Sequence, residues 1–134
     1  MEANRFRKTP LASTYGDVVA MPSSITYAAT AAGEVTDFFE LPVGAELFEL
    51  GIVNDALGAS TTMSYGFRYK DPADGTADPD AFKADASATS AASLCLPIHP
   101  IVFDVPVIIT GTLAGGAATG KVTITSKYRY LGTK

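Results

Sequence analysis

The amino-acid sequence predicts an all-β fold, an antiparallel β-sandwich that is jelly-roll-like and carries one short helical insert. Residues 120–131 (GKVTITSKYRYL) alternate apolar and aromatic side chains with polar and basic ones, which is the period of two of a half-buried strand. Eight or nine short segments of this kind recur at a spacing of roughly ten residues, separated by turn residues. A jelly roll is the first choice, and other Greek-key sandwiches and small barrels fit the same pattern.

The chain length of 134 residues suits one domain. Residues 1–16 are predicted to form an extended N-terminal arm, because Pro10, Gly16 and mixed polarity argue against regular structure there. Residues 17–134 are predicted to form a single β-sandwich domain. We expect the arm to lie on another subunit or back on its own sheet.

Five strands are predicted in the first half of the domain, at residues 17–21, 24–31, 34–41, 45–54 and 61–69. Pro22 separates the first two. Residues 45–54 (AELFELGIVN) fit a helix or a strand, and the β-branched pair after a mid-run glycine favours the strand. With a period of two, Phe48, Leu50 and Ile52 would share one face. The last segment, TTMSYGFRY, alternates cleanly between large apolar or aromatic residues and small or basic ones.

A short helix is predicted over residues 78–88, after an acid-rich turn. Asp78 suits an N-cap and Pro79 suits the first helical position. Phe82 would then anchor this helix in the core.

The last third of the chain is predicted to return to strands. Residues 86–93 are small and fit either a linker or a weak strand. The strand Ile101–Asp104 is interrupted by Pro106, so we expect it at an edge or bulged. Residues 105–113 (VPVIITGTL) are the expected hairpin partner of residues 120–131.

The composition is low in charge, and the charge is unevenly distributed. Hydrophobic residues make up 47% of the chain and charged residues 18%, with a net charge of −4. Such a surface indicates cover by a partner; a plain monomer rich in Ala, Gly and Thr is the alternative. Residues 17–104 hold thirteen of the fourteen acids, whereas both ends of the chain are basic. This separation of acidic and basic segments suits contact between copies or with a neighbouring protein, and two solvated patches are the alternative.

The sequence gives no sign of an oxidised, secreted or membrane-spanning protein. Cys95 is the only cysteine, so no internal disulfide is possible, and its position between two leucines predicts a small buried hydrophobe. The start MEANRFRKTPL lacks the apolar stretch of a secretory signal. No apolar run approaches the ~20 residues of a membrane span, so no membrane partner is expected.

Three motifs could carry chemistry, and each has a simpler interpretation. The segment Gly115–Val122 nearly spells the phosphate-binding loop G-x-x-x-x-G-K-[ST], but Val122 has no hydroxyl and a strand pattern follows, which favours a Gly-rich turn. His99, the only histidine, lacks partners for a nucleophile or zinc site and is predicted to be structural. Five acids could offer Ca²⁺ their carboxylates, but their spacing is not that of an EF-hand, and turn and cap roles are preferred. They are Asp71, Asp74, Asp78, Asp80 and Asp85.

Aromatic and basic side chains on two predicted strands could form a face for single-stranded nucleic acid, or the tyrosines alone a sugar-binding face. They are Tyr65, Tyr69, Tyr128 and Tyr130 with Arg68 and Arg129. Alternation places the tyrosines and arginines of each strand on opposite faces. The tyrosines are therefore predicted to belong to the core, and no direct contact with nucleic acid is expected.

Five segments together resemble a known class of protein: LPVGAELFELGIVND, STTMSYGFRY, DGTADPDAFKADAS, HPIVFDVPVIITGTLAGG and ATGKVTITSKYRYLG, covering about residues 34–132. This layout resembles the capsid decoration, or cement, proteins of tailed bacteriophages. The resemblance implies a non-enzymatic protein on the capsid exterior of the virion, made in the host cytoplasm and often a homotrimer at local three-fold axes. It implies the major capsid protein and copies of itself as partners, and no cofactor.

The expected function is therefore that of a structural virion protein, which binds the outside of a phage capsid and stabilises it by bridging capsid subunits. The candidate partner-binding residues are Arg5, Phe6, Arg7 and Lys8 of the arm. Another virion component (head–tail joining, tail or fibre-associated) and a jelly-roll carbohydrate-binding module are the alternatives. An enzyme is disfavoured, because the sequence shows no acid–base or nucleophile set and no metal site.

Overall fold

The computed structural model describes residues 18–130, which form eight β-strands and one short 3-10 helix. They are β1 (Val18–Thr30), β2 (Val35–Leu41), β3 (Ala45–Asn54), β4 (Thr62–Tyr69), η3 (Pro72–Asp74), β5 (Asp78–Ser87), β6 (Ala92–Val102), β7 (Val107–Ala114) and β8 (Ala118–Tyr130). In this part of the chain, no helix is long and apolar enough to cross a membrane.

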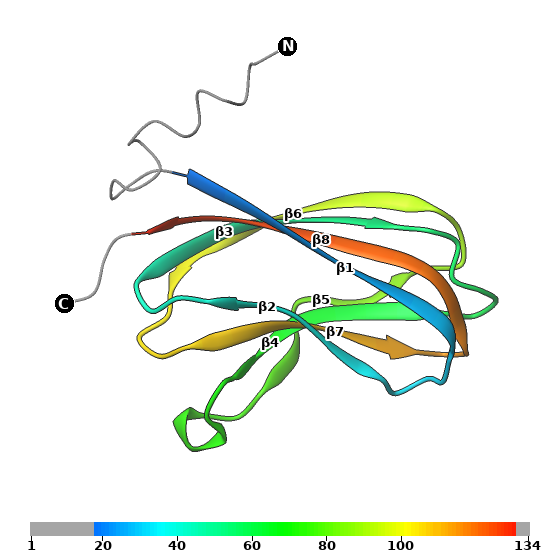
Figure 1. The fold of residues 1–134 in the computed structure, drawn as a ribbon, viewed down its shortest axis with the longest axis horizontal. Coiled ribbons are helices and arrows are strands. Elements are labelled where there is room, and N and C mark those ends of the chain that lie inside the picture. The colour runs from blue at the N-terminus through cyan, green and yellow to red at the C-terminus, as the bar shows by residue number, and fades with distance from the viewer. Residues whose placement is uncertain (1–17, 131–134) are drawn as a thin grey trace, which may run out of the picture.

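The strands form two four-stranded sheets, which pack face to face (Figure 1). The strand order is β1-β8-β3-β6 in one sheet, here called sheet A, and β2-β7-β4-β5 in the other, sheet B. All neighbouring pairs are antiparallel. Consecutive strands alternate between the sheets except β4 and β5, which are neighbours in sheet B. The prediction of an all-β antiparallel sandwich is thus confirmed.

The core lies between the sheets and is filled by alternate residues of the central strands. On β8, Val122, Ile124 and Ser126 are fully buried, as the alternation predicts. On β4, Met63 and Tyr65 are buried in the same way. The apolar side chains remove their surface from water at about 25 cal/mol per Å², so this face-to-face contact is the main stabilising term of the fold.

The predicted hairpin between residues 105–113 and 120–131 is wrong. β7 pairs with β2 and β4 in sheet B, whereas β8 pairs with β1 and β3 in sheet A. Both strands are central, so each already has neighbours on its two edges. The connection at residues 115–117 therefore crosses from one sheet to the other instead of closing a hairpin.

The predicted helix over residues 78–88 is also wrong, because this segment is the edge strand β5. It pairs with β4, with Phe67 opposite Asp78 and Tyr65 opposite Lys83. Pairing with an existing sheet outweighed the local capping signals, which are weak priors. Phe82 does pack against the core as predicted, but from a strand.

The prolines that lie within the described strands are all in edge strands, where a residue without an N–H is tolerated. The two strands predicted on either side of Pro22 are one continuous edge strand, β1, which pairs through Pro22 with β8. Pro97 and Pro100 lie within β6, the other edge of sheet A. β6 also contains Ile101, so the predicted edge position of that segment is confirmed.

A β-bulge changes the expected faces of β3. Its register with both neighbours shifts between Leu47 and Glu49. As a result Leu47, Leu50 and Ile52 are all buried, while Phe48 is only partly buried. A strict period of two placed Leu47 on the opposite face from Leu50, and the extra residue of the bulge reverses that assignment.

Candidate functional site

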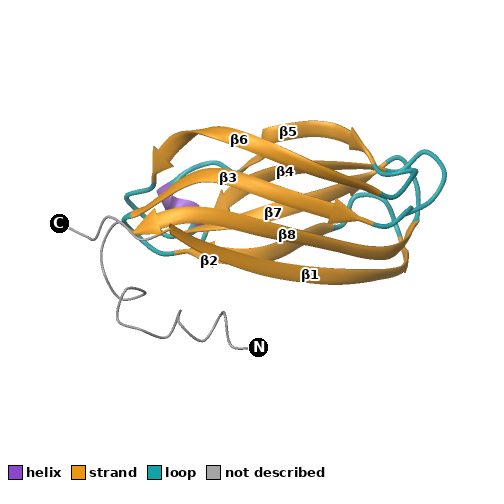
Figure 2. Ribbon diagram, turned by 90° about the horizontal axis from the view of Figure 1, so that it is seen from above, coloured by secondary structure: helices purple, strands orange, loops and turns teal. Residues whose placement is uncertain are grey.

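The side of the sandwich between β5 and β6 is only partly closed in the described molecule. β5 is an edge strand of sheet B and β6 an edge strand of sheet A, and the two run beside each other (Figure 2). Their inward side chains are only partly buried, including Phe82 on β5 and Leu94 and Ile98 on β6. Two cavities lie along this β5–β6 flank, one toward each end.

The first cavity, of about 410 Å³, is mainly apolar and aromatic. Phe67 and Phe82 line it with their ring centroids 6.0 Å apart, and Phe103 packs on Phe67 at 5.1 Å. His99 also lines it, on the exposed part of β6. None of the residues that line this cavity is a Ser, Thr or Cys, so the histidine has no nucleophile beside it here. The cavity is suited to apolar contact rather than to a reaction.

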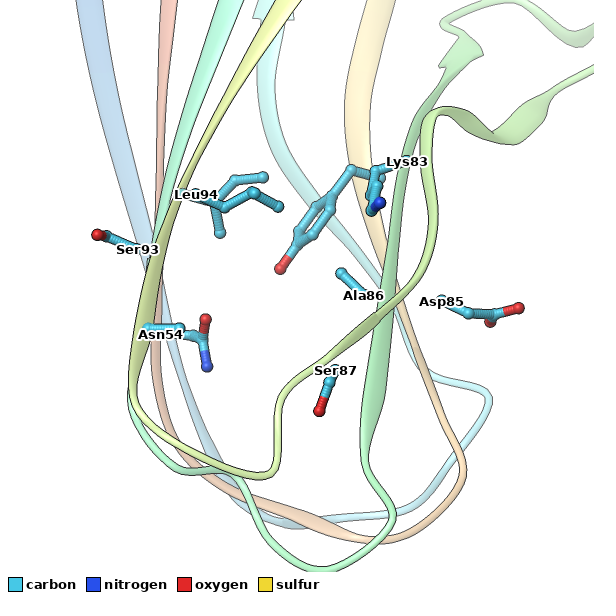
Figure 3. A pocket seen from close by; sticks show the side chains of 10 residues that line it. Asn54, Lys83, Asp85, Ala86, Ser87, Ser93 and Leu94 are labelled. Carbon is cyan, nitrogen blue, oxygen red and sulfur yellow. The ribbon is translucent and has the colours of Figure 1, made fainter.

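The second cavity, of about 310 Å³, combines apolar walls with two buried polar side chains (Figure 3). It is called here the Asn54–Tyr65 cavity. Asn54, the last residue of β3, is 7% exposed, and its Nδ2 donates to the carbonyl oxygens of Asp55 at 2.8 Å and Ser90 at 3.2 Å. Tyr65 is 2% exposed, and burial raises the pKa of its phenol well above the ordinary value. The phenol is therefore neutral at physiological pH.

Ion pairs neutralise most of the basic side chains in the described chain. Arg68 pairs with Asp37 at 2.8 Å on sheet B, and Lys127 pairs with Glu49 at 2.9 Å on sheet A. The acids of β5 have no such partner among residues 18–130. They are Asp78, Asp80 and Asp85. Because β5 also carries Lys83, the β5–β6 flank has three acids against one base and a net negative charge.

A row of side chains crosses the outer face of sheet A where β1 begins. Register places Val18 beside Arg129, Arg129 beside Glu46, and Glu46 beside Val102. Arg129 and Glu46 form an ion pair at 2.7 Å. The two valines stay 60% and 45% exposed, which is high for large apolar side chains. This row, here called the Val18–Val102 row, is a candidate contact surface next to the point where residues 1–17 join β1.

Cys95 is exposed, so the prediction of a buried hydrophobe is wrong. Cys95 lies opposite Gly51 on β3, and its thiol donates a hydrogen bond to the Glu49 carboxylate. Alternation along the edge strand β6 turns Leu94 and Leu96 inward and the residue between them outward. Partial desolvation and the Glu49 carboxylate raise the pKa of the thiol.

Most other sequence motifs have structural roles. Gly115 has φ +85°, and a Cβ there would overlap the Ser60 carbonyl oxygen, so the Gly-rich segment is a tight inter-sheet turn. Asp71 accepts the N–H of Ala73 at 3.0 Å and caps η3. Within residues 18–130, no three His, Cys, Asp or Glu side chains gather as a metal site would require.

The predicted core position of the tyrosines is confirmed where they are packed. Tyr65 is buried, and Tyr69 and Tyr128 pack against the core. Arg68, on the other face of β4, turns outward to Asp37. The predicted partner-binding residues of the arm, which are Arg5, Phe6, Arg7 and Lys8, lie outside the described residues.

The Asn54–Tyr65 cavity was not predicted from sequence. The sequence pattern indicated Asn54 only as the residue that ends a strand and Tyr65 only as one of several core aromatic residues. The only available signal was a polar residue that directly follows the apolar run of β3.

No family model and no curated protein matches the sequence. Three solved structures resemble the fold over nearly the whole length of both chains. A chain of the capsid asymmetric unit of cyanophage Pam1 has TM-score 0.65 and 18% identity, covering 87% of this chain and 86% of that one. A chain of the capsid of Ralstonia phage GP4 has TM-score 0.67 and 22% identity, covering 98% and 96%. A chain of the acidic stable capsid of Helicobacter pylori bacteriophage KHP30 has TM-score 0.65 and 15% identity, covering 89% and 92%. The protein therefore shares its fold with chains of phage capsids.

Proposed function

We propose that this protein is a structural, non-enzymatic component of a phage virion, which binds the outside of the capsid and stabilises it by bridging capsid subunits. The observation that carries the proposal is the match to chains of three phage capsids. Each match covers 86–98% of this chain and of the matched chain, so the matched chains are about as long as this one. The likeness is thus to whole small capsid components and not to one domain of a larger protein.

The proposal includes a jelly-roll topology for the sandwich. Jelly rolls have eight strands in two sheets, built from two Greek keys. The orders β1-β8-β3-β6 and β2-β7-β4-β5 support this assignment, since the first strand of each sheet lies beside the last or next-to-last strand of the chain. The fold would bring both ends of the domain to the same end of sheet A, where Val18 pairs with Arg129.

The proposed contact surface has two parts. The first is the arm, in which Arg5, Phe6, Arg7 and Lys8 would dock on the major capsid protein or on a neighbouring copy in a homotrimer. The second is the Val18–Val102 row, in which the exposed Val18 adjoins the root of that arm and the exposed Val102 lies at the opposite edge of sheet A. Apolar contact and charge complementarity at one place are typical of specific protein interfaces.

The test is addition of the purified protein to capsids assembled from the major capsid protein of the encoding phage alone. We expect it to co-sediment with the particles, to raise their resistance to heat, and to appear as density on their outer surface by cryo-electron microscopy. Deletion of residues 1–10 and the change Val102→Glu should each weaken attachment while the circular dichroism spectrum is unchanged.

The matched control is Lys121→Ala, which removes an exposed base without an ion pair in residues 18–130. Attachment that is unaffected by the arm deletion would contradict the role of the arm. Density confined to the head–tail junction, tail or fibres would contradict the bridging role and favour another virion component.

A further inference from the structure

The Asn54–Tyr65 cavity is built differently from the rest of the β5–β6 flank, because its polar groups are buried and face it. Both oxygens belong to side chains that are more than nine-tenths buried. Neither the Tyr65 hydroxyl nor the Asn54 Oδ1 has a hydrogen-bond partner among residues 18–130. The unpaired side-chain oxygens that are closed to solvent in residues 18–130 are those of Thr112 and Ser126, so the Asn54 and Tyr65 oxygens, whose residues line the cavity, keep some accessible surface.

The loop fixes the orientation of the Asn54 amide. Its two N–H groups are used by the carbonyl oxygens of Asp55 and Ser90, which leaves the oxygen as a free acceptor. Figure 3 shows that oxygen turned toward the cavity and the nitrogen turned toward the loop. A buried acceptor without a donor costs free energy, and a bound group with a hydroxyl would satisfy it.

The walls and the charge define the kind of ligand. Ile52, Ala86 and Leu94 are apolar, and Leu94 points into the space from β6 (Figure 3). Lys83 and Asp85 both line the cavity, so their opposite charges balance. The volume of about 310 Å³ is at the small end of the range for small-molecule sites. The site therefore suits a small neutral ligand with both apolar and hydroxyl surfaces.

We propose that this cavity binds one pyranose unit of a glycan. A sugar ring offers C–H faces to Ile52 and Leu94 and adjacent hydroxyls to the two buried oxygens. One hydroxyl would donate to Asn54 Oδ1, and its neighbour would share a hydrogen bond with the Tyr65 phenol, which can both donate and accept. This binding activity does not rest on the proposed virion role and is tested separately from it.

The experiment uses the full chain and free glucose, galactose, mannose and N-acetylglucosamine as probes, followed by two-dimensional NMR. At least one sugar should shift the Asn54 side-chain amide and the Leu94 methyl signals, with a Kd on the order of millimolar. Tyr65→Phe should weaken binding about two- to tenfold, since one hydrogen bond is lost. Ala86→Leu fills the cavity and should abolish binding.

The matched control is Thr26→Ala, because Thr26 is an exposed hydroxyl-bearing residue of β1 and does not line the cavity. It should bind the sugar as the unchanged protein does. If no probe shifts these signals, the proposal is wrong. It is also wrong if Tyr65→Phe binds with unchanged affinity, or if cyclohexanol binds and no sugar does, since the site would then be merely apolar. The Tyr65→Phe variant keeps the ring and its packing, so it tests the hydroxyl even if Ala86→Leu does not fold.

Discussion

The change Gly66→Ala tests the position of β5, which is the largest departure from the sequence prediction. Gly66 lies on β4 directly under β5. A Cβ at this position would overlap the Asp78 carbonyl oxygen and the Pro79 carbonyl carbon, and would lie 2.7 Å from the Pro79 oxygen. Ordinary contacts of a Cβ begin at 3.4 Å, and these atoms belong to the backbone, so the start of β5 must move away. Overpacking of this kind costs about 1–3 kcal/mol.

The expected result is a melting temperature lower by about 3–10 °C, from the usual relation between stability and melting for a domain of this size. Thermal unfolding followed by circular dichroism measures it, and hydrogen exchange should show faster exchange in the first half of β5. Gly51→Ala on β3 is the matched control, because the nearest atom to its new Cβ is the Thr125 oxygen at 3.9 Å. A Gly66→Ala protein as stable as Gly51→Ala would refute the pairing of β5 with β4. A helix over residues 78–88 would leave Gly66 uncovered and predicts no difference between the variants.

Three further changes test the core and the surface charges. Leu50→Ala removes a fully buried side chain and should lower the free energy of unfolding by about 2–5 kcal/mol in a urea titration. The raised pKa of the Cys95 thiol predicts slow alkylation by iodoacetamide at pH 8, because less thiolate is present; Glu49→Gln removes a cause of the shift and should speed the reaction. The hydrogen bonds from Arg68 lower the pKa of Asp37, so this pair stabilises the fold above the ordinary carboxyl pKa and stops doing so as pH falls through the lowered value. Asp37→Asn should therefore cost less than ~1 kcal/mol at pH 7, as the pair is half exposed, and should cost nothing measurable near pH 2.

Strands were predicted best where one face of the strand is buried and the other face is exposed to solvent. On β4 and β8 this condition holds along most of the length, so Met63 and Tyr65 or Val122 and Ile124 alternate visibly with polar residues. On β3 it fails at one point, because the bulge near Phe48 inserts a residue and shifts the pattern. A bulge is invisible to periodicity, since both halves of the strand still alternate.

Pairing partners were less predictable than strands. Two neighbouring segments joined by a Gly-rich connection can form a hairpin or can lie in different sheets. Here β7 lies between β2 and β4 in sheet B, and this placement separates it from β8. For residues 78–87 the local signals at Asp78 and Pro79 favour a helix start, but these residues also suit the exposed start of an edge strand. The helix signals amount to about 1 kcal/mol, and contact with the sheet outweighs them.

The candidate sites were hidden from the sequence for the same reason. Asn54 and Tyr65 lie on β3 and β4, which belong to different sheets, and only the packing of these sheets brings both to one cavity. Val18 and Val102 are 84 positions apart and share a face through the registers of β8 and β3. Neither set forms a motif along the chain.

The edges of the two sheets limit how this protein can associate. Three of the four edge strands contain proline, which cannot donate to an added strand. These residues are Pro22, Pro79, Pro97 and Pro100. The fourth edge strand, β2, has a register irregularity between Asp37 and Phe39, which interrupts a regular ladder. Extension of a sheet by a neighbouring strand is therefore disfavoured at every edge. Association through side chains remains open, and the exposed valines of sheet A and the apolar β5–β6 flank are the described surfaces that offer them.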